Sequence, residues 1–172
     1  MRASFAAGIS ASLILAQAFA IGEARADPAY KADAVVAFFI QADREPVVCI
    51  GTEYECPPML IQRRFVLVKF PFNSAELSQR DKESLDEFAK ALKDPRLSRR
   101  KFAIDGHSDA SGAEQNNLDL SQKRASAVAA YLALFGVPVK ATVGFGSAKP
   151  LVPNKFSPEN RRVEARMYTS FR

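Results

Sequence analysis

One strongly patterned stretch, residues 117–135, constrains the fold of this chain more than any other feature. Apolar side chains recur there on one stripe of a helical wheel, and polar side chains occupy the other side. The stripe comprises Leu120, Val128, Tyr131, Leu132 and Phe135, and the polar side comprises Asp119, Gln122, Lys123 and Ser126. An amphipathic helix of this kind must pack its apolar stripe against another layer of the protein.

The segments around this helix alternate between strand and helix patterns. Strand composition is found at residues 65–70, 101–105, 140–145 and 163–168. A further helix is predicted to start at Ser78, which forms a capping-box pattern with Asp81, and to stop at Asp94-Pro95. The order β-α-β-α-β-β, with crossover helices of this length, implies parallel neighbouring strands with both helices on one face. We therefore predict an α/β (α+β) fold, a two-layer sandwich with a mixed sheet.

A charged pair marks the candidate site. Arg124 lies four residues after Leu120 and four before Val128, so it points from the apolar face and needs a carboxylate or a route to solvent. Asp109 lies just upstream, in the turn that ends an apolar run. A fixed cation beside a fixed anion at one sheet edge would bind a small zwitterion. The alternative is that Asp109 and Arg124 pair only with each other, as a structural ion pair.

Residues 1–26 are predicted to be a signal peptide. Arg2 is followed by an apolar centre at residues 11–19 and by an Ala24-Arg25-Ala26 cleavage pattern. The alternative is an uncleaved membrane anchor, because the stretch between Arg2 and Glu23 carries no charge. We expect export to the periplasm and cleavage, which leaves no integral membrane span.

Residues 27–64 are predicted to be an N-terminal extension ahead of a domain at 65–172. Its residues 30–41 favour a short helix whose apolar side chains pack or dock a partner protein. Cys49 and Cys56 are close in sequence, and in an exported protein this predicts a disulfide bond. A metal site is the competing interpretation, but two thiols at this spacing with one distant histidine match no familiar zinc pattern.

Charge and histidine content argue against two functional classes. The net charge is +5, but the basic residues are scattered and no basic run is interleaved with aromatics, so we expect no nucleic-acid binding. His107 is the only histidine, and its polar neighbours lie in the same turn. Adjacent residues in one turn rarely converge as a catalytic triad must, so we expect neither an enzyme nor a cofactor or metal.

Several spaced motifs together resemble the OmpA-like C-terminal domain family. The resemblance covers about residues 65–172 and is carried by residues 70–75 (FPFNSA), 104–109 (IDGHSD), Gly112, 117–125 (NLDLSQKRA), 144–146 (GFG), Pro150 and 160–164 (NRRVE). Motifs that agree in order over this length are more specific than any single short pattern.

The resemblance implies noncovalent binding of peptidoglycan through the diaminopimelate of its stem peptide. At the matching positions, Asp109 would take the ligand's ammonium and Arg124 its carboxylate, by a bidentate grip that a lysine could not reproduce. Asn117 would either cap its helix or hydrogen-bond the ligand. Of Arg161 and Arg162, one would line the pocket while the other pairs elsewhere, and we favour Arg162 as the pocket residue.

The resemblance also implies a soluble periplasmic protein that acts in the cell envelope. Two departures from the family bear on the site: Pro71 stands where many members have an aspartate, and the segment between residues 154 and 160 is shorter than usual. These departures keep an alternative open, in which the domain has lost wall binding and serves as an interaction or scaffold module. Residues 27–64 are then the expected contact for an envelope protein partner.

Overall fold

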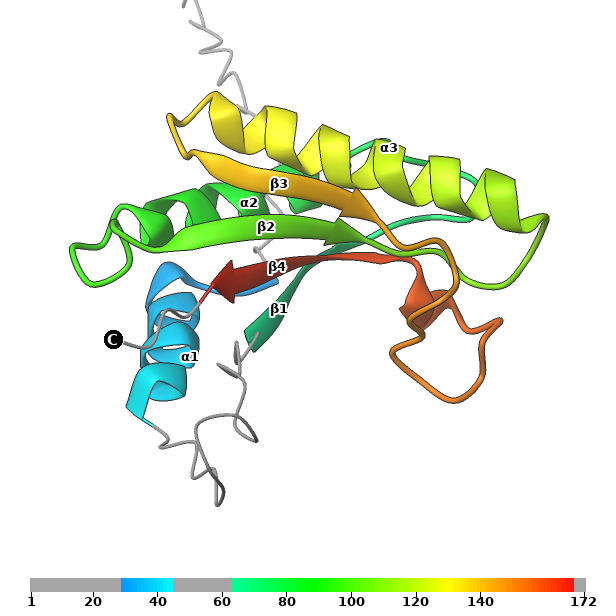
Figure 1. Cartoon of the computed structure of the whole chain (residues 1–172). Coiled ribbons are helices and arrows are strands. Elements are labelled where there is room, and N and C mark those ends of the chain that lie inside the picture. The colour runs from blue at the N-terminus through cyan, green and yellow to red at the C-terminus, as the bar shows by residue number, and fades with distance from the viewer. Residues whose placement is uncertain (1–28, 45–62, 169–172) are drawn as a thin grey trace, which may run out of the picture.

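A computed structural model of the chain describes residues 29–44 and 63–168, which form a single layer of strands covered by helices (Figure 1). The elements in chain order are α1 (Ala32–Arg44), β1 (Arg63–Lys69), α2 (Gln79–Leu92), β2 (Lys101–Gly106), α3 (Glu114–Ala133), β3 (Val139–Gly144), the 3-10 helix η1 (Pro158–Asn160) and β4 (Arg162–Tyr168). The β-α-β-α-β-β order predicted for the main domain is confirmed.

The four strands form one mixed sheet in the order β1-β4-β2-β3. β2 and β3 are parallel, as the helical crossover between them predicts. The expectation of parallel neighbours is wrong for β1 and β2, because β4 inserts between them and pairs antiparallel with both. The last strand of the chain therefore lies in the interior of the sheet and joins its two halves.

The helices pack on one face of the sheet. α3 covers β2 and β3, α2 covers β1, and α1 packs against α2 and β1. Along β4 the apolar side chains Val163, Ala165 and Met167 point into this layer and are completely buried. Their alternation with charged residues is the pattern of a strand with two different faces.

Local signals account for the start of α2. Ser78 Oγ accepts a hydrogen bond from the Asp81 backbone N–H at 3.2 Å, and the Asp81 carboxylate accepts from the Ser78 N–H at 2.9 Å. This capping box confirms the predicted helix start. The helix ends at Leu92, just before the Asp94-Pro95 stop.

α1 contributes to the hydrophobic core. Val35, Val36 and Phe39 are buried, and the Phe39 ring lies 5.2 Å from the Phe102 ring of β2 in an edge-to-face contact. Packing by this segment, one of the two alternatives predicted, is thereby confirmed for Phe39. In the part of the chain that the structure describes, no helix combines the length and apolarity needed to cross a membrane.

The predicted signal peptide lies outside the described residues. So do Cys49 and Cys56, whose disulfide bond stays a prediction.

Candidate functional site

Asp109 and Arg124 line the same pocket, which has a volume of about 210 Å³. Apart from Arg161, its lining residues follow β1 and β2 or belong to α3 up to Arg124. Figure 1 shows that β1 and β2 stop, and α3 begins, at the same end of the sheet. Three segments distant in sequence supply its walls: the turn after β1, the turn after β2 with the start of α3, and the residue before β4. Its lining comprises Phe72, Asn73, Asp109, Ser111, Gly112, Asn116, Asn117, Leu120, Arg124 and Arg161.

Close docking of α3 on the sheet positions Arg124. A Cβ added to Gly106 would lie 2.0 Å from the Ser121 carbonyl oxygen, so only glycine permits this approach of helix and strand. The Gly144 N–H donates to the Gln122 side chain at 2.8 Å, and the Gly146 N–H donates to Ser121 Oγ at 2.8 Å. Gly106, Gly144 and Gly146 therefore allow α3 to lie close to the ends of β2 and β3.

The guanidinium of Arg124 is completely buried and is held by backbone carbonyls. Nε donates to Ser74 O at 2.8 Å, Nη2 to Pro71 O at 3.0 Å and Nη1 to His107 O at 3.1 Å. Its carbon Cζ also lies 5.2 Å from the centre of the Phe70 ring. Arg124 thus ties the turn after β1 to the turn after β2, and three of its five N–H groups are used for this.

Asp109 is paired with Arg161, not with Arg124. The carboxylate oxygen Oδ2 accepts from Arg161 Nη1 at 2.9 Å, and Oδ1 accepts from the Ser111 N–H at 3.2 Å. Among the described residues no ion pair joins Asp109 to Arg124, so the simple structural pairing of these two is not what the fold uses.

The pocket carries three charged side chains: the carboxylate of Asp109 and the guanidinium groups of Arg124 and Arg161. The described lining therefore has a net charge of +1. Burial lowers the pKa of Arg124 to about 10, the neighbouring cation of Arg161 adds to the lowering, and Asp109 opposes it. Arg124 still carries its proton at neutral pH, so the pocket favours a ligand with at least one negative charge.

Three asparagines line the pocket, Asn73, Asn116 and Asn117. Asn117 is buried in the second turn of α3, which begins at Glu114 with Ala113 as its N-cap residue. The alternative that Asn117 caps this helix is therefore wrong, because the helix starts a turn earlier than its apolar periodicity indicates. Asn73 adopts the left-handed backbone conformation, with φ 51°, which asparagine tolerates better than most residues.

Arg162 does not line the pocket. It is the first residue of β4, and its Nε donates to Glu164 Oε1 at 2.6 Å on the sheet face opposite the helices. Arg161 precedes the strand and reaches the pocket instead. Successive residues of a strand point to opposite faces of the sheet. Because β4 begins at Arg162, Arg162 points to the face opposite the helices and Arg161 remains in the preceding turn.

Hydrogen bonds hold both segments that depart from the family pattern, Pro71 and the shortened loop between residues 154 and 160. Pro71 has no N–H, but its carbonyl accepts a hydrogen bond from Arg124 Nη2. In the shortened loop, the buried Asn160 side chain accepts from the N–H groups of Leu151 and Val152 and donates to Asn154 O. These bonds hold the loop that leads into Arg161.

His107 lies away from the pocket on the opposite face of the sheet. Its ring is completely buried, stacks on Phe145 at 5.4 Å and places Nε2 at 3.5 Å from Glu164 Oε2. Its backbone carbonyl, and not its ring, contacts the site through Arg124.

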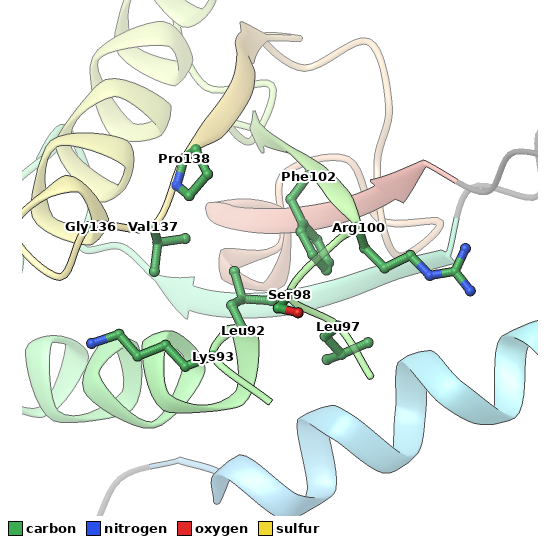
Figure 2. A pocket seen from close by; sticks show the side chains of 9 residues that line it. All are labelled: Leu92, Lys93, Leu97, Ser98, Arg100, Phe102, Gly136, Val137 and Pro138. Atoms are coloured by element: carbon green, nitrogen blue, oxygen red, sulfur yellow. The ribbon is translucent and has the colours of Figure 1, made fainter. Parts of the chain in front are cut away.

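A second pocket of about 300 Å³ lies at the opposite end of the sheet, where α2 and α3 end (Figure 2). Apolar side chains of Leu92, Leu97, Phe102 and Val137 line it, and Lys93 and Arg100 are its flanking cations. The described lining includes no carboxylate, so this pocket lacks the pair of opposite charges that a zwitterion needs.

The fold and the pocket together define a small α/β domain with a charged pocket at one end of its sheet. The model of the OmpA family matches residues 69–164, and the chain belongs to the OmpA family. This is the family that the sequence motifs indicated.

Relatives in this family are 34–40% identical to the chain over the matched regions. A peptidoglycan-associated lipoprotein of Buchnera aphidicola subsp. Baizongia pistaciae is 34% identical over 102 residues, which cover 56% of this chain and 58% of that protein. The peptidoglycan-binding protein ArfA of Mycobacterium bovis is 40% identical over 106 residues, covering 56% of this chain and 31% of that protein. The chain thus spans about a third to three fifths of the length of these curated relatives.

Solved structures share the fold. The OmpA-like domain of FopA1 from Francisella tularensis is 32% identical with a TM-score of 0.52, covering 57% of this chain and 67% of that one. The peptidoglycan-associated lipoprotein from Burkholderia pseudomallei is 31% identical with a TM-score of 0.52, covering 58% of this chain and 87% of that one.

Proposed function

We propose that this protein binds peptidoglycan noncovalently, through the diaminopimelate of the stem peptide. Two of its relatives carry peptidoglycan in their names, one as an associated lipoprotein and one as a binding protein. The observation that carries the proposal is the presence of one carboxylate and two guanidinium groups in a single pocket at the end of the sheet. Binding of this kind requires no covalent step and no cofactor.

The free end of diaminopimelate matches the charges of this pocket. It carries a carboxylate and an ammonium on the same carbon, which are the partners of an arginine and an aspartate. In the proposed complex the ligand's carboxylate binds Arg124 and its amine faces Asp109. Charge-assisted hydrogen bonds of this type are shorter and stronger than neutral ones.

Access of a ligand to Arg124 requires a small movement of the pocket wall. The guanidinium has two N–H groups left after its three backbone bonds, but the residue has no exposed surface. The turn after β1 is the exposed part of the lining, with the Phe72 side chain 66% exposed. We expect Phe72 and Asn73 to move aside when the carboxylate enters.

The secondary contacts differ from those first expected. Asn117 is buried beside the charged groups and is proposed to hydrogen-bond the ligand. Arg161 takes the place in the pocket that the sequence had assigned to Arg162. Export to the periplasm, and an envelope protein partner for residues 27–64, stay predictions.

Calorimetric titration with synthetic stem peptides tests the proposal. The probes are L-Ala-γ-D-Glu-meso-diaminopimelate and the same tripeptide with lysine, which lacks the second carboxylate. We expect the purified protein to bind the diaminopimelate peptide at least about tenfold more tightly, because the lysine peptide leaves buried guanidinium groups without their anion.

Arg124→Lys removes the planar fork but keeps the charge, and should abolish this preference. Arg99→Lys, at an exposed position away from the pocket, is the matched control and should keep it. Equal binding of both peptides by the wild-type protein, or binding of neither, would contradict the proposal.

A further inference from the structure

The anion of the pocket already has a cationic partner within the protein. Asp109 Oδ2 accepts from Arg161 Nη1 at 2.9 Å, and this ion pair is largely buried, with side-chain exposures of 5% for Asp109 and 17% for Arg161. Asp109 Oδ1 accepts from the Ser111 N–H. A ligand ammonium that approaches Asp109 therefore meets a neutralised ion pair and not an unpaired carboxylate.

Arg161 is fixed in this position from two sides. Its Nε donates to Phe70 O at 3.1 Å, and its own backbone carbonyl accepts from the Phe70 N–H at 2.8 Å. Side chain and main chain are both bonded to the end of β1. Displacing Arg161 from Asp109 would break a buried charged hydrogen bond, which is costly when no equal partner replaces it. The ion pair is therefore expected to persist when a ligand binds.

The charge balance of the pocket supports the same conclusion. With Arg124, Arg161 and Asp109 the described lining has a net charge of +1. A zwitterionic ligand leaves this charge uncancelled, whereas a ligand with a carboxylate and an uncharged amide in place of its ammonium cancels it. The net positive charge of the pocket therefore favours the ligand's carboxylate and gives no preference for its ammonium.

We infer that Arg161 substitutes for the ligand's ammonium at Asp109, so that the site binds acylated diaminopimelate about as well as the free amine. Arg161 is then a specificity-determining residue that makes the carboxylate essential and the ammonium dispensable. This inference rests on the proposed function and extends its substrate class: an amine acylated by a neighbouring stem peptide, as in a cross-link, would also be accepted.

The decisive experiment adds a third probe, the diaminopimelate tripeptide acetylated on its free amine. The wild-type protein is expected to bind the acetylated and free-amine peptides with dissociation constants within about threefold of each other, because Asp109 is paired in both complexes. A loss of about tenfold or more on acetylation would overturn the inference while leaving the proposed function intact. Failure to bind either diaminopimelate peptide would instead overturn the proposed function.

Replacing Arg161 should create the dependence on ammonium that the wild-type protein lacks. In Arg161→Gln, Asp109 loses its cation, so the acetylated peptide should bind at least about tenfold more weakly than the free amine. Arg161→Lys keeps a cation beside Asp109 and should restore much of the tolerance, and Arg99→Gln should behave like the wild type. If Arg161→Gln is folded by circular dichroism and binds both peptides equally, the inference is wrong.

Discussion

Arg124 shows how one buried cation is accommodated without a carboxylate of its own. Its three hydrogen-bond partners are the carbonyls of Pro71, Ser74 and His107, which come from two separate turns. Carbonyl dipoles partly replace the lost hydration, and their cross-linking of two turns gives the pocket its shape. The same residue is thus both a structural clamp and the proposed carboxylate receptor.

Glu164 is the charged residue whose titration should be visible in folding stability. Burial acts to raise its pKa, but the neighbouring His107 ring and the hydrogen bond and charge of Arg162 lower it to about 2. A carboxylate with a depressed folded pKa stabilises the protein above its unfolded pKa, and this contribution is lost as the pH falls toward the folded value.

We therefore expect the free energy of unfolding to fall as the pH drops from about 4.5 to about 2, in part through Glu164. Urea unfolding at several pH values measures this loss. In Glu164→Gln the protein should be less stable at pH 6 and should lose less stability on acidification, whereas the exposed Glu76→Gln should follow the wild type. An unchanged acid dependence in a folded Glu164→Gln protein would show that this carboxylate is not the titrating group.

At the scale of elements, the contact between α3 and the sheet is the feature that builds the site. Gly106 permits the approach because its missing side chain leaves room for the Ser121 carbonyl. Arg124 lies one turn further along α3 from Ser121, so any shift of this helix also shifts the guanidinium.

Gly106→Ala should destabilise the protein by at least about 3 kcal/mol, because the added Cβ would meet helix backbone that cannot yield locally. Gly136→Ala is the matched control. Nothing lies within 4 Å of that Cβ position, and its positive φ of 70° predicts a cost of only about 1–2 kcal/mol. Chemical unfolding of both variants gives the comparison. Similar losses for the two would rule out the steric account of helix docking.

α1 gives a second prediction at this scale. Phe39 is completely buried and contacts Phe102, so Phe39→Ala should cost about 3–5 kcal/mol in the free energy of unfolding. The control is Leu134→Ala on the exposed side of the α3 C-terminus, where the side chain is 79% exposed and little change is expected. A loss below about 1 kcal/mol for Phe39→Ala would mean that α1 does not belong to the core.

Features that depend on neighbouring residues could be predicted from the sequence. Features that depend on which strands pair could not. The capping box at Ser78 and the amphipathic α3 follow from nearby residues. The position of β4 between β1 and β2 does not, because its alternating pattern predicts two faces but no neighbours. The sequence named Arg161 and Arg162 as candidates but could not decide between them, because the start of β4 at Arg162 leaves Arg161 in the turn that reaches the pocket.

At the scale of the whole molecule, the two ends of the sheet differ in character. One end gathers opposite charges from three distant segments, and the other holds a largely apolar pocket flanked by cations. The sheet face opposite the helices carries a buried ionic network, in which Arg166 binds Asp105 through two hydrogen bonds of 2.6 and 2.9 Å. Such a network rigidifies the central strands from which the site turns emerge.

Co-sedimentation of the purified protein with isolated sacculi tests the central claim most directly. Diaminopimelate-type and lysine-type walls would be compared for the wild type and Arg124→Ala, with Arg99→Ala as control and circular dichroism to establish folding. We expect the wild type and the control to pellet with the diaminopimelate-type wall alone, and Arg124→Ala to remain in the supernatant. A folded wild-type protein that stays in solution with both walls would contradict it.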